Sequence, residues 1–198
     1  TLSSSSAASD VYKRQVFTSR VSSTHISNLP KRGILEHTCK KYQYQKGTYN
    51  GKPVQVANYY DQYGELTGQK LRFADKTFCV LGSINDTFYG QQLYSGGDQL
   101  IVTEGEIDCL TVSQMFANTI PVVSLPKGAK SARRTFESNL EWLQHFNEVV
   151  VIFDNDEAGR EAVKSVEGIL EADRLKVVVL NQHKDPNEYP VSYTHLTL

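Results

Sequence analysis

The stretch Glu148–Val163, EVVVIFDNDEAGREAV, contains an apolar run, an acidic turn and the start of a helical pattern. The run Glu148–Phe153 is too apolar to face water on either side, so it predicts a strand buried on both faces. The spacing of apolar residues from Ala158 to Leu170 predicts a helix after the acidic turn. A buried strand followed at once by a helix is typical of a βαβ unit in a parallel sheet.

The same alternation of short apolar runs and helical spacings extends along the carboxy-terminal half of the chain. Crossovers between parallel strands are right-handed, and such strands are buried on both faces. The pattern therefore predicts an α/β domain with a mostly parallel four-stranded sheet and three helices. The other expected strands are Gln99–Thr103, Val122–Leu125 and Leu175–Leu180, and the other expected helices are Ile107–Phe116 and Ala132–Phe146.

The amino-terminal half predicts a smaller α+β or β-rich lobe. Pro53–Tyr60 and Leu66–Phe73 alternate apolar and polar residues around the turn-forming sequence DQYG, which indicates a hairpin. Lys70 and Arg72 are two residues apart on the second strand and so project from one face. Lys76 follows after a short step. By spacing alone, a solvated strand face is the favoured interpretation of Lys70 and Arg72.

Composition excludes several classes of protein. The 198 residues include 21 Lys and Arg and 22 Asp and Glu, so the net charge is -1 and any contact with nucleic acid must be local. No apolar run approaches the roughly 20 residues of a membrane-spanning helix, which predicts a soluble protein with no membrane partner. The cysteines are odd in number and lack CxxC spacing, which excludes a disulfide scaffold and a zinc ribbon. They are expected to be small, buried residues of a reducing compartment: Cys39, Cys79 and Cys109.

Shifts in composition divide the chain into four segments. Residues 1–15 are a Ser/Ala-rich run with a charged tail, and residues 191–198 follow Pro190 abruptly. We expect both segments to be non-native tails, with ordinary disorder as the alternative, and the remainder to be a fragment of a longer protein. Between the tails we expect an amino-terminal lobe over residues 16–97 and the α/β domain over residues 98–190.

Acidic residues follow two of the expected strands. Glu104 comes directly after the first strand of the α/β domain, and Asp154 and Asp156 come after the third. The carboxyl ends of parallel strands meet at one edge of a sheet, where ligands bind, so these carboxylates should lie around one rim. Two like charges about 4 Å apart cost on the order of 4 kcal/mol at an effective dielectric near 20. Magnesium, or manganese in its place, would relieve this repulsion and bind phosphate oxygens of a substrate.

Each acidic position also has a structural interpretation. Glu106, Asp108 and Glu157 lie in first helical turns, where the helix dipole favours acids, so capping is preferred for them over catalysis. Asp154 and Asp156 can be turn residues. The combination is stronger than an isolated DxD, because it pairs an acid after one apolar strand with DxDxAG after another.

Two further sequences follow predicted strands. SLPKGAK, residues 124–130, contains glycine and lysine, which is equally consistent with a phosphate cradle at a helix start and with a plain loop. HKDPNE, residues 183–188, would bring Asp185 to the same rim, although by spacing alone KDPN is the sequence of a turn.

At these residues the sequence resembles the Toprim domain, a catalytic module of primases, topoisomerases and some nucleases. More narrowly, it is similar to the RNA polymerase domain of the bifunctional primase-helicases of podovirus-type phages, relatives of the mitochondrial helicase Twinkle. The resemblance is carried by VTEGEIDCLTV, PVVSLPKGA, VIFDNDEAGREAV and HKDPNE, and it extends upstream through VQVANYYDQYGELTGQKLR, DKTF and LGS.

The resemblance implies a DNA primase, a nucleotidyltransferase that joins ribonucleoside triphosphates into short RNA primers on a single-stranded DNA template during replication. Glu104 would bind metal or act as general base toward the attacking hydroxyl. Four carboxylates correspond to metal ligands of the family: Glu104, Asp154, Asp156 and Asp185. Three cations correspond to residues that face the catalytic cleft and hold nucleotide phosphates, with the two lysines also implied as catalytic: Lys70, Arg72 and Lys76. Lys127 stands where relatives often have another residue, so no role is implied for it.

The resemblance also implies partners and a location. Family members carry an amino-terminal zinc-binding domain and a carboxy-terminal helicase domain, and they act in the cytoplasm of the bacterial host. No CxxC pair precedes the lobe and no GxxxxGK[ST] loop occurs here, which truncation explains most simply. Two alternatives stay open: a Toprim nuclease, in which the acids activate water, and a catalytically silent module that binds single-stranded DNA in a replicative helicase.

Overall fold

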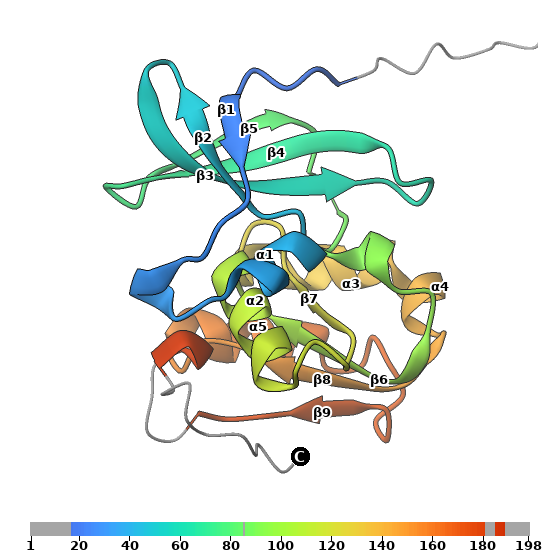
Figure 1. Cartoon of the computed structure of the whole chain (residues 1–198). Coiled ribbons are helices and arrows are strands. Elements are labelled where there is room, and N and C mark those ends of the chain that lie inside the picture. The colour runs from blue at the N-terminus through green and yellow to red at the C-terminus, as the bar shows by residue number, and fades with distance from the viewer. Residues whose placement is uncertain (1–16, 85, 181–184, 189–198) are drawn as a thin grey trace, which may run out of the picture.

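The protein has an antiparallel sheet that lies above an α/β unit, as Figure 1 shows for the computed structural model. The structure describes residues 17–84, 86–180 and 185–188. The two expected tails, residues 1–15 and 191–198, lie outside the described residues. None of the helices in the described part of the chain is long and apolar enough to cross a membrane.

The amino-terminal lobe is a five-stranded sheet in which each strand pairs with its neighbour in the chain, antiparallel throughout. The predicted hairpin is confirmed, with Ala57 opposite Lys70 and Gln55 opposite Arg72. In its turn, the Asp61 side chain accepts hydrogen bonds from two backbone amides, at 2.9 and 3.0 Å. The strands are β1 (Ser22–His25), β2 (Gln45–Tyr49), β3 (Lys52–Tyr60), β4 (Leu66–Phe73) and β5 (Phe78–Gly82).

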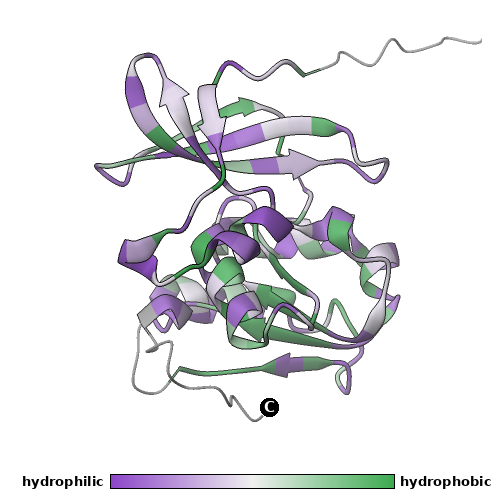
Figure 2. Cartoon of the chain, in the orientation of Figure 1, coloured by the Kyte–Doolittle hydropathy of each residue, from purple (hydrophilic) through white to green (hydrophobic). Residues whose placement is uncertain are grey.

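The α/β unit contains the predicted four-stranded sheet, in the order β7-β6-β8-β9 with all pairs parallel. Figure 2 shows hydrophobic residues concentrated along its central strands. Alternate residues of β6 enter two different cores, with Leu100 and Val102 on one face and Ile101 on the other, so this strand is buried on both sides. The strands are β6 (Gly97–Thr103), β7 (Val122–Ser124), β8 (Phe146–Ile152) and β9 (Leu175–Val177).

Helices cover both faces of the parallel sheet. Buried residues of α1 (Glu36–Lys41) and α2 (Glu106–Met115) pack on one face. Residues of α3 (Ala132–Ser138), α4 (Leu140–Leu143) and α5 (Glu157–Val166) pack on the other. Short 3-10 segments lie at Pro30–Arg32, Gln91–Leu93, Ala129–Ser131 and Pro186–Glu188.

The single helix predicted over Ala132–Phe146 is wrong. The helical path breaks at Asn139, whose φ of -117° and ψ of 19° are not helical, and Phe146 already belongs to β8. The Asn139 amide donates to the carbonyl oxygens of Thr135 and Asp86. Side-chain amides that bond backbone carbonyls compete with helix formation, so this residue ends α3 and separates it from α4.

The two lobes share a core across the expected boundary near residue 97. Leu29, Ile34 and Tyr42 come from the amino-terminal segment, yet they pack with residues of the parallel sheet and α2. The boundary itself stays a prediction. Of the three cysteines expected to be buried, Cys39 and Cys109 are, whereas Cys79 is only half-buried because it lies on the edge strand β5.

The start of α5 explains two residues of the motif DxDxAG, its second aspartate and its glycine. Asp156 is the N-cap, and its Oδ1 accepts a hydrogen bond of 3.0 Å from the backbone nitrogen of Gly159. A Cβ atom at Gly159 would lie 2.0 Å from the carbonyl oxygen of Asp154. Glycine at this position therefore lets the helix start directly against the acidic turn.

We expect Gly159→Ala to lower the free energy of unfolding by about 1–3 kcal/mol, because the added methyl group meets backbone atoms that cannot move aside cheaply. Alanine is otherwise the better helix former, by roughly 0.5–1 kcal/mol, so the sign of the change is the test. Urea unfolding measures it, with Lys164→Ala on the exposed side of α5 as the control. A gain in stability for Gly159→Ala would contradict the close approach.

Candidate functional site

Two of the predicted acids meet where the parallel strands end. Thr103 of β6 lies opposite Ile152 of β8, so the residues that follow them leave the sheet at the same level. The backbone nitrogen of Asp154 donates a hydrogen bond of 3.3 Å to Glu104 Oε2. The structure thus brings Glu104 and Asp154 together at one rim, as the strand pattern predicted.

A cavity of about 550 Å³ opens beside these acids, and we call it the inter-lobe cavity. The α/β unit contributes Glu104, Asp154 and the loop Pro126–Gly128 to its lining. The antiparallel lobe contributes Lys70 and Arg72 of β4, together with residues of β5. Carboxylates on one side therefore face cations on the other, which suits a ligand that carries phosphates and is bound with a divalent cation.

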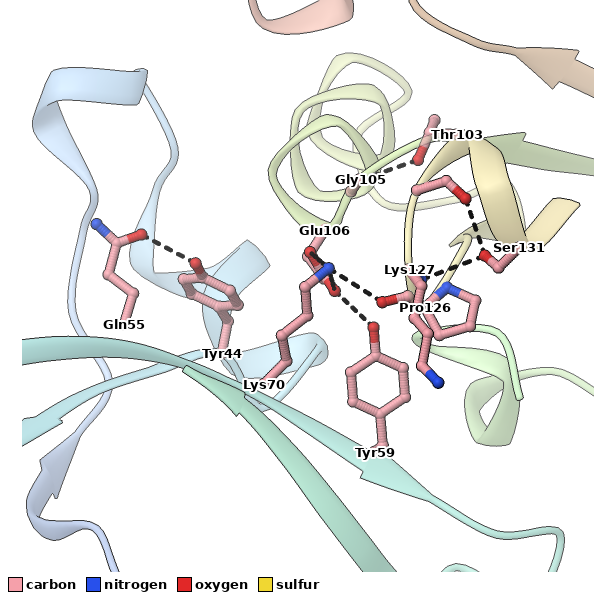
Figure 3. A network of polar contacts seen from close by, with 11 residues as sticks. Tyr44, Gln55, Tyr59, Lys70, Thr103, Gly105, Glu106, Pro126, Lys127 and Ser131 are labelled. Carbon is pink, nitrogen blue, oxygen red and sulfur yellow. Dashed lines mark hydrogen bonds and ion pairs between the residues drawn. The ribbon is translucent and has the colours of Figure 1, made fainter. Parts of the chain in front are cut away.

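Lys70 does not stand free in this cavity, because it forms an ion pair with Glu106 at the start of α2 (Figure 3). Its Nζ lies 2.9 Å from Glu106 Oε1 and also donates to the carbonyl oxygen of Pro126, at 3.0 Å. The Tyr59 hydroxyl donates to Glu106 Oε1 at 2.5 Å. The side chains of Lys70 and Glu106 are only 14% and 9% exposed, so each needs the other to offset its lost hydration.

Phe78 projects into the same cavity from β5 and is 52% exposed. Lys70 Nζ lies 5.1 Å from the centre of its ring, and Arg72 Cζ lies 5.5 Å from it. These distances are within the range of cation–π contacts. The exposed ring of Phe78 is therefore in contact with both cations that line the cavity.

Three predicted site residues do not line the inter-lobe cavity. Asp156 is the N-cap of α5, and Asp185 accepts a hydrogen bond of 3.0 Å from the Asn187 backbone. Lys76 is exposed in the turn between β4 and β5, with a φ of 68°. His183 and Lys184 of the HKDPNE motif lie outside the described residues. The roles of Asp156, Asp185 and Lys76 stay predictions.

Burial and the acids gathered at the rim raise the pKa of a neighbouring carboxyl group, that of Asp108. Burial is the larger cause, followed by the carboxylates of Asp185, Asp154 and Glu104, and together they raise the pKa of Asp108 to about 8. The carboxylate of Asp185 therefore contributes to the negative charge around Asp108. Concentrated negative charge on hard oxygen atoms is the donor chemistry that fits a divalent cation.

Among residues 17–84, 86–180 and 185–188, no three His, Cys, Asp or Glu side chains converge as a ready-made metal site. Magnesium is usually bound through one or two carboxylates, with water and substrate phosphates as its remaining ligands. Glu104 and Asp154 match that requirement, because both line the cavity and a single hydrogen bond already joins them.

The loop predicted as either a phosphate cradle or a plain loop is part of the cavity wall. The Lys127 backbone nitrogen donates to Ser131 Oγ at 3.3 Å, and Ser131 Oγ donates to the Gly128 carbonyl oxygen at 2.8 Å. A Cβ atom at Gly128 would lie 3.5 Å from Glu104 Oε1. The loop therefore folds closely beside Glu104, and its exposed Lys127 lines the cavity.

Sequence reasoning missed Tyr59 and Phe78, and it preferred helix capping for two acids that line the cavity, Glu106 and Asp108. Glu106 was assigned to helix capping, whereas the structure buries it in the ion pair with Lys70. Its partners are 36 and 47 positions away in the chain, so local spacing carried no signal for them. The sequence did hold a signal for Phe78. This residue follows, after a short turn, the strand that carries two cations two residues apart.

Two family models match the chain. The model for the N-terminal α+β fold of bacteriophage T7 DNA helicase/primase matches residues 24–82, and a Toprim-like model matches residues 101–190. The DNA helicase/primase of enterobacteria phage T3 is 42% identical over 163 residues, which is 82% of this chain and 29% of that protein. The chain therefore spans less than a third of the length of this curated relative.

Solved structures from bacteriophage T7 are also similar. The primase fragment of its primase-helicase protein is 42% identical, with a TM-score of 0.81 over 84% of this chain and 70% of that one. T7 primase domains bound to an RNA/DNA hybrid and dTTP, in a complex with the lagging-strand DNA polymerase, are 42% identical. That match has a TM-score of 0.80 over 84% of this chain and 85% of that one.

The hydrogen bond from Tyr59 to the ionised Glu106 should contribute more stability than one to a neutral acceptor. We expect Tyr59→Phe to lower the free energy of unfolding by about 1.5–3 kcal/mol, and the matched variant Tyr44→Phe by about 1 kcal/mol. Tyr44 is as buried as Tyr59, but it donates to the neutral Gln55 Oε1, at 2.9 Å. Urea unfolding of both variants makes the comparison, and equal losses would argue against an ionised acceptor.

Proposed function

The chain belongs to the family of phage T7-type primase-helicases, and from this membership we propose that it is a primase catalytic core. It would join ribonucleoside triphosphates into short RNA primers on single-stranded DNA. The observation that carries the proposal is the inter-lobe cavity, where Glu104 and Asp154 face Lys70 and Arg72. Phosphoryl transfer needs little covalent chemistry from a protein, but it needs reactants held in line and negative charge stabilised.

In the proposed reaction, the 3′ hydroxyl of one nucleotide attacks the α-phosphorus of the next. A new P–O bond forms, the bond from that phosphorus to the bridging oxygen breaks, pyrophosphate leaves, and the hydroxyl proton is removed. Magnesium, or manganese, held by Glu104 and Asp154 would bind phosphate oxygens and offset the negative charge of the site. Asp156 and Asp185 are further proposed ligands, and Glu104 is also the proposed general base.

The cations of the antiparallel lobe would hold the triphosphate. Arg72 presents a guanidinium that can bind two phosphate oxygens at once, whereas Lys70 acts as a point charge that Glu106 and Pro126 hold in place. This arrangement makes Glu106 a positioning residue for Lys70. We propose a supplementary role for Lys76, on the neighbouring turn, in binding the phosphates.

The partners of the full-length protein are part of the same proposal. The T7 structure with a polymerase, an RNA/DNA hybrid and dTTP concerns domains 42% identical to this chain. We propose that this core likewise works on a single-stranded DNA template and that the full-length protein supplies zinc-binding and helicase domains.

We expect Glu104→Gln and Asp154→Asn each to reduce magnesium-dependent primer synthesis by about 100-fold or more, because each removes a carboxylate that would hold the divalent cation and so weakens the stabilisation of charge on the reacting phosphates. Synthesis is measured with single-stranded template and labelled ribonucleotides. Glu157→Gln is the matched control, since Glu157 lies in the first turn of α5 and outside the cavity lining.

The same assay separates the alternative functions. Cleavage of the DNA in place of synthesis would indicate a nuclease, and metal-independent binding with neither product would indicate a silent module. If synthesis is absent from the wild-type chain, the assay is repeated with an extended chain that includes the zinc-binding domain, before the variants are compared.

Arg72 forms no ion pair among the described residues, so its removal should affect nucleotide binding with little effect on folding. We expect Arg72→Ala to raise the KM for ribonucleotides by about 10-fold, equivalent to about 1.4 kcal/mol. Lys76→Ala tests the exposed turn, and we expect a smaller rise there. A change in the free energy of unfolding of Arg72→Ala with unchanged KM would contradict its proposed contact with phosphate.

A further inference from the structure

A second cavity, of about 670 Å³, lies where the tip of the β3–β4 hairpin meets the segment after Thr87 and the end of α4. We call it the aromatic cavity, after the rings that line it: Tyr60, Tyr94, Trp142 and His145. It shares no lining residue with the inter-lobe cavity. Neither the family assignment nor the proposed reaction uses it.

Two of these rings, those of Trp142 and Tyr94, are held in place by neighbouring residues. Trp142 packs against Phe146 and Phe88, with ring centroids 4.9 and 5.8 Å apart. Its indole nitrogen donates to the Tyr94 carbonyl oxygen at 3.0 Å, and the Tyr94 hydroxyl bonds that of Tyr42 at 2.8 Å. A planar ligand would therefore meet aromatic surfaces that need little ordering on binding.

Side-chain amides supply the polar part of the lining. The Gln91 amide is already used, because it accepts from the Phe88 backbone and donates to Asn139. Gln92 Oε1 is buried and has no hydrogen-bond partner in the described part of the chain, so this amide can turn toward a ligand without breaking a bond at that oxygen. Gln62 lies exposed at the hairpin tip, where its amide can both donate and accept.

The lining offers little positive charge with which to hold a phosphate inside the cavity. Among the described residues that line the cavity there is no Lys or Arg, and Asp61 is acidic. Aromatic faces combined with neutral amide donors and acceptors match a nucleobase, whose flat ring stacks and whose edge forms hydrogen bonds. The volume is within the range of small-molecule sites.

We propose that the aromatic cavity binds a nucleobase presented by single-stranded nucleic acid, with the sugar–phosphate backbone left outside. The identity of that strand, template or primer, rests on the proposed primase function, but the binding itself does not. Stacking on an aromatic side chain is tolerant of sequence, so the site would retain a strand without selecting which sequence is copied.

The chain contains a single tryptophan, Trp142, so its fluorescence reports directly on this cavity. The whole chain is titrated with a short single-stranded DNA of mixed sequence, with the same DNA lacking its bases, and with free nucleosides. We expect the complete DNA to quench the fluorescence, nucleosides to do so only at higher concentration, and abasic DNA to have no effect. Quenching by abasic DNA equal to that by complete DNA, or none by either, would overturn the proposal. Quenching by nucleosides alone would exclude a strand as the source of the base.

Two variants locate the effect. Gln62→Ala should weaken the binding of complete DNA measured by this quenching by about 5- to 10-fold, consistent with the loss of one hydrogen bond to the base. Glu65→Ala is the matched control, because Glu65 is exposed in the same turn and outside the lining. Equal binding by the two variants would count against a base in the cavity.

The titration is repeated with Glu104→Gln, in which primer synthesis should be lost while base binding persists. Failure of the aromatic cavity and failure of the proposed catalytic function are thus separate results.

Discussion

The arrangement of the inter-lobe cavity depends on one buried carboxylate, that of Glu106. It begins α2 of the α/β unit, yet Tyr59 and Lys70, which bind it, both come from the antiparallel sheet. A carboxylate taken out of water is costly unless charge and hydrogen bonds replace the lost hydration. Because these groups come from the other lobe, the same contacts hold the two lobes together and fix the position of Lys70.

This contact explains how a chain of net charge -1 can present a site for a polyanionic ligand. The acids that line the cavity, Glu104 and Asp154, follow strands of the parallel sheet, whereas the cations Lys70 and Arg72 belong to β4. Apart from Lys127 of the α/β unit, the charged residues named here are therefore divided by lobe, and their charges cancel only in the sum. Because all four side chains line one cavity, a ligand bound there experiences both signs of charge.

Much of the fold was predictable from the sequence because its strands obey local rules. Glu148–Phe153 is apolar at nearly every position, which only a strand buried on both faces requires, and DxDxAG reflects a cap and a close approach within six residues. The break at Asn139 was not predictable, because Ala132–Phe146 keeps an amphipathic spacing. The carbonyl of Asp86 that takes up the Asn139 amide is 53 residues away.

Part of the candidate site was likewise predictable from local sequence rules, and part of it was not. Glu104 and Asp154 could be placed together from sequence, since parallel strands that start in register also end in register, and each acid directly follows its strand. The ion pair of Lys70 could not be predicted from sequence, because strand alternation indicates which face of the sheet a side chain takes but not which residue lies opposite it. Only the packing of α2 under β3 and β4 reveals that Lys70 is already paired. A lysine held by Glu106 and by the Pro126 carbonyl is oriented before substrate arrives, so an incoming phosphate gains a positioned charge without ordering a flexible side chain.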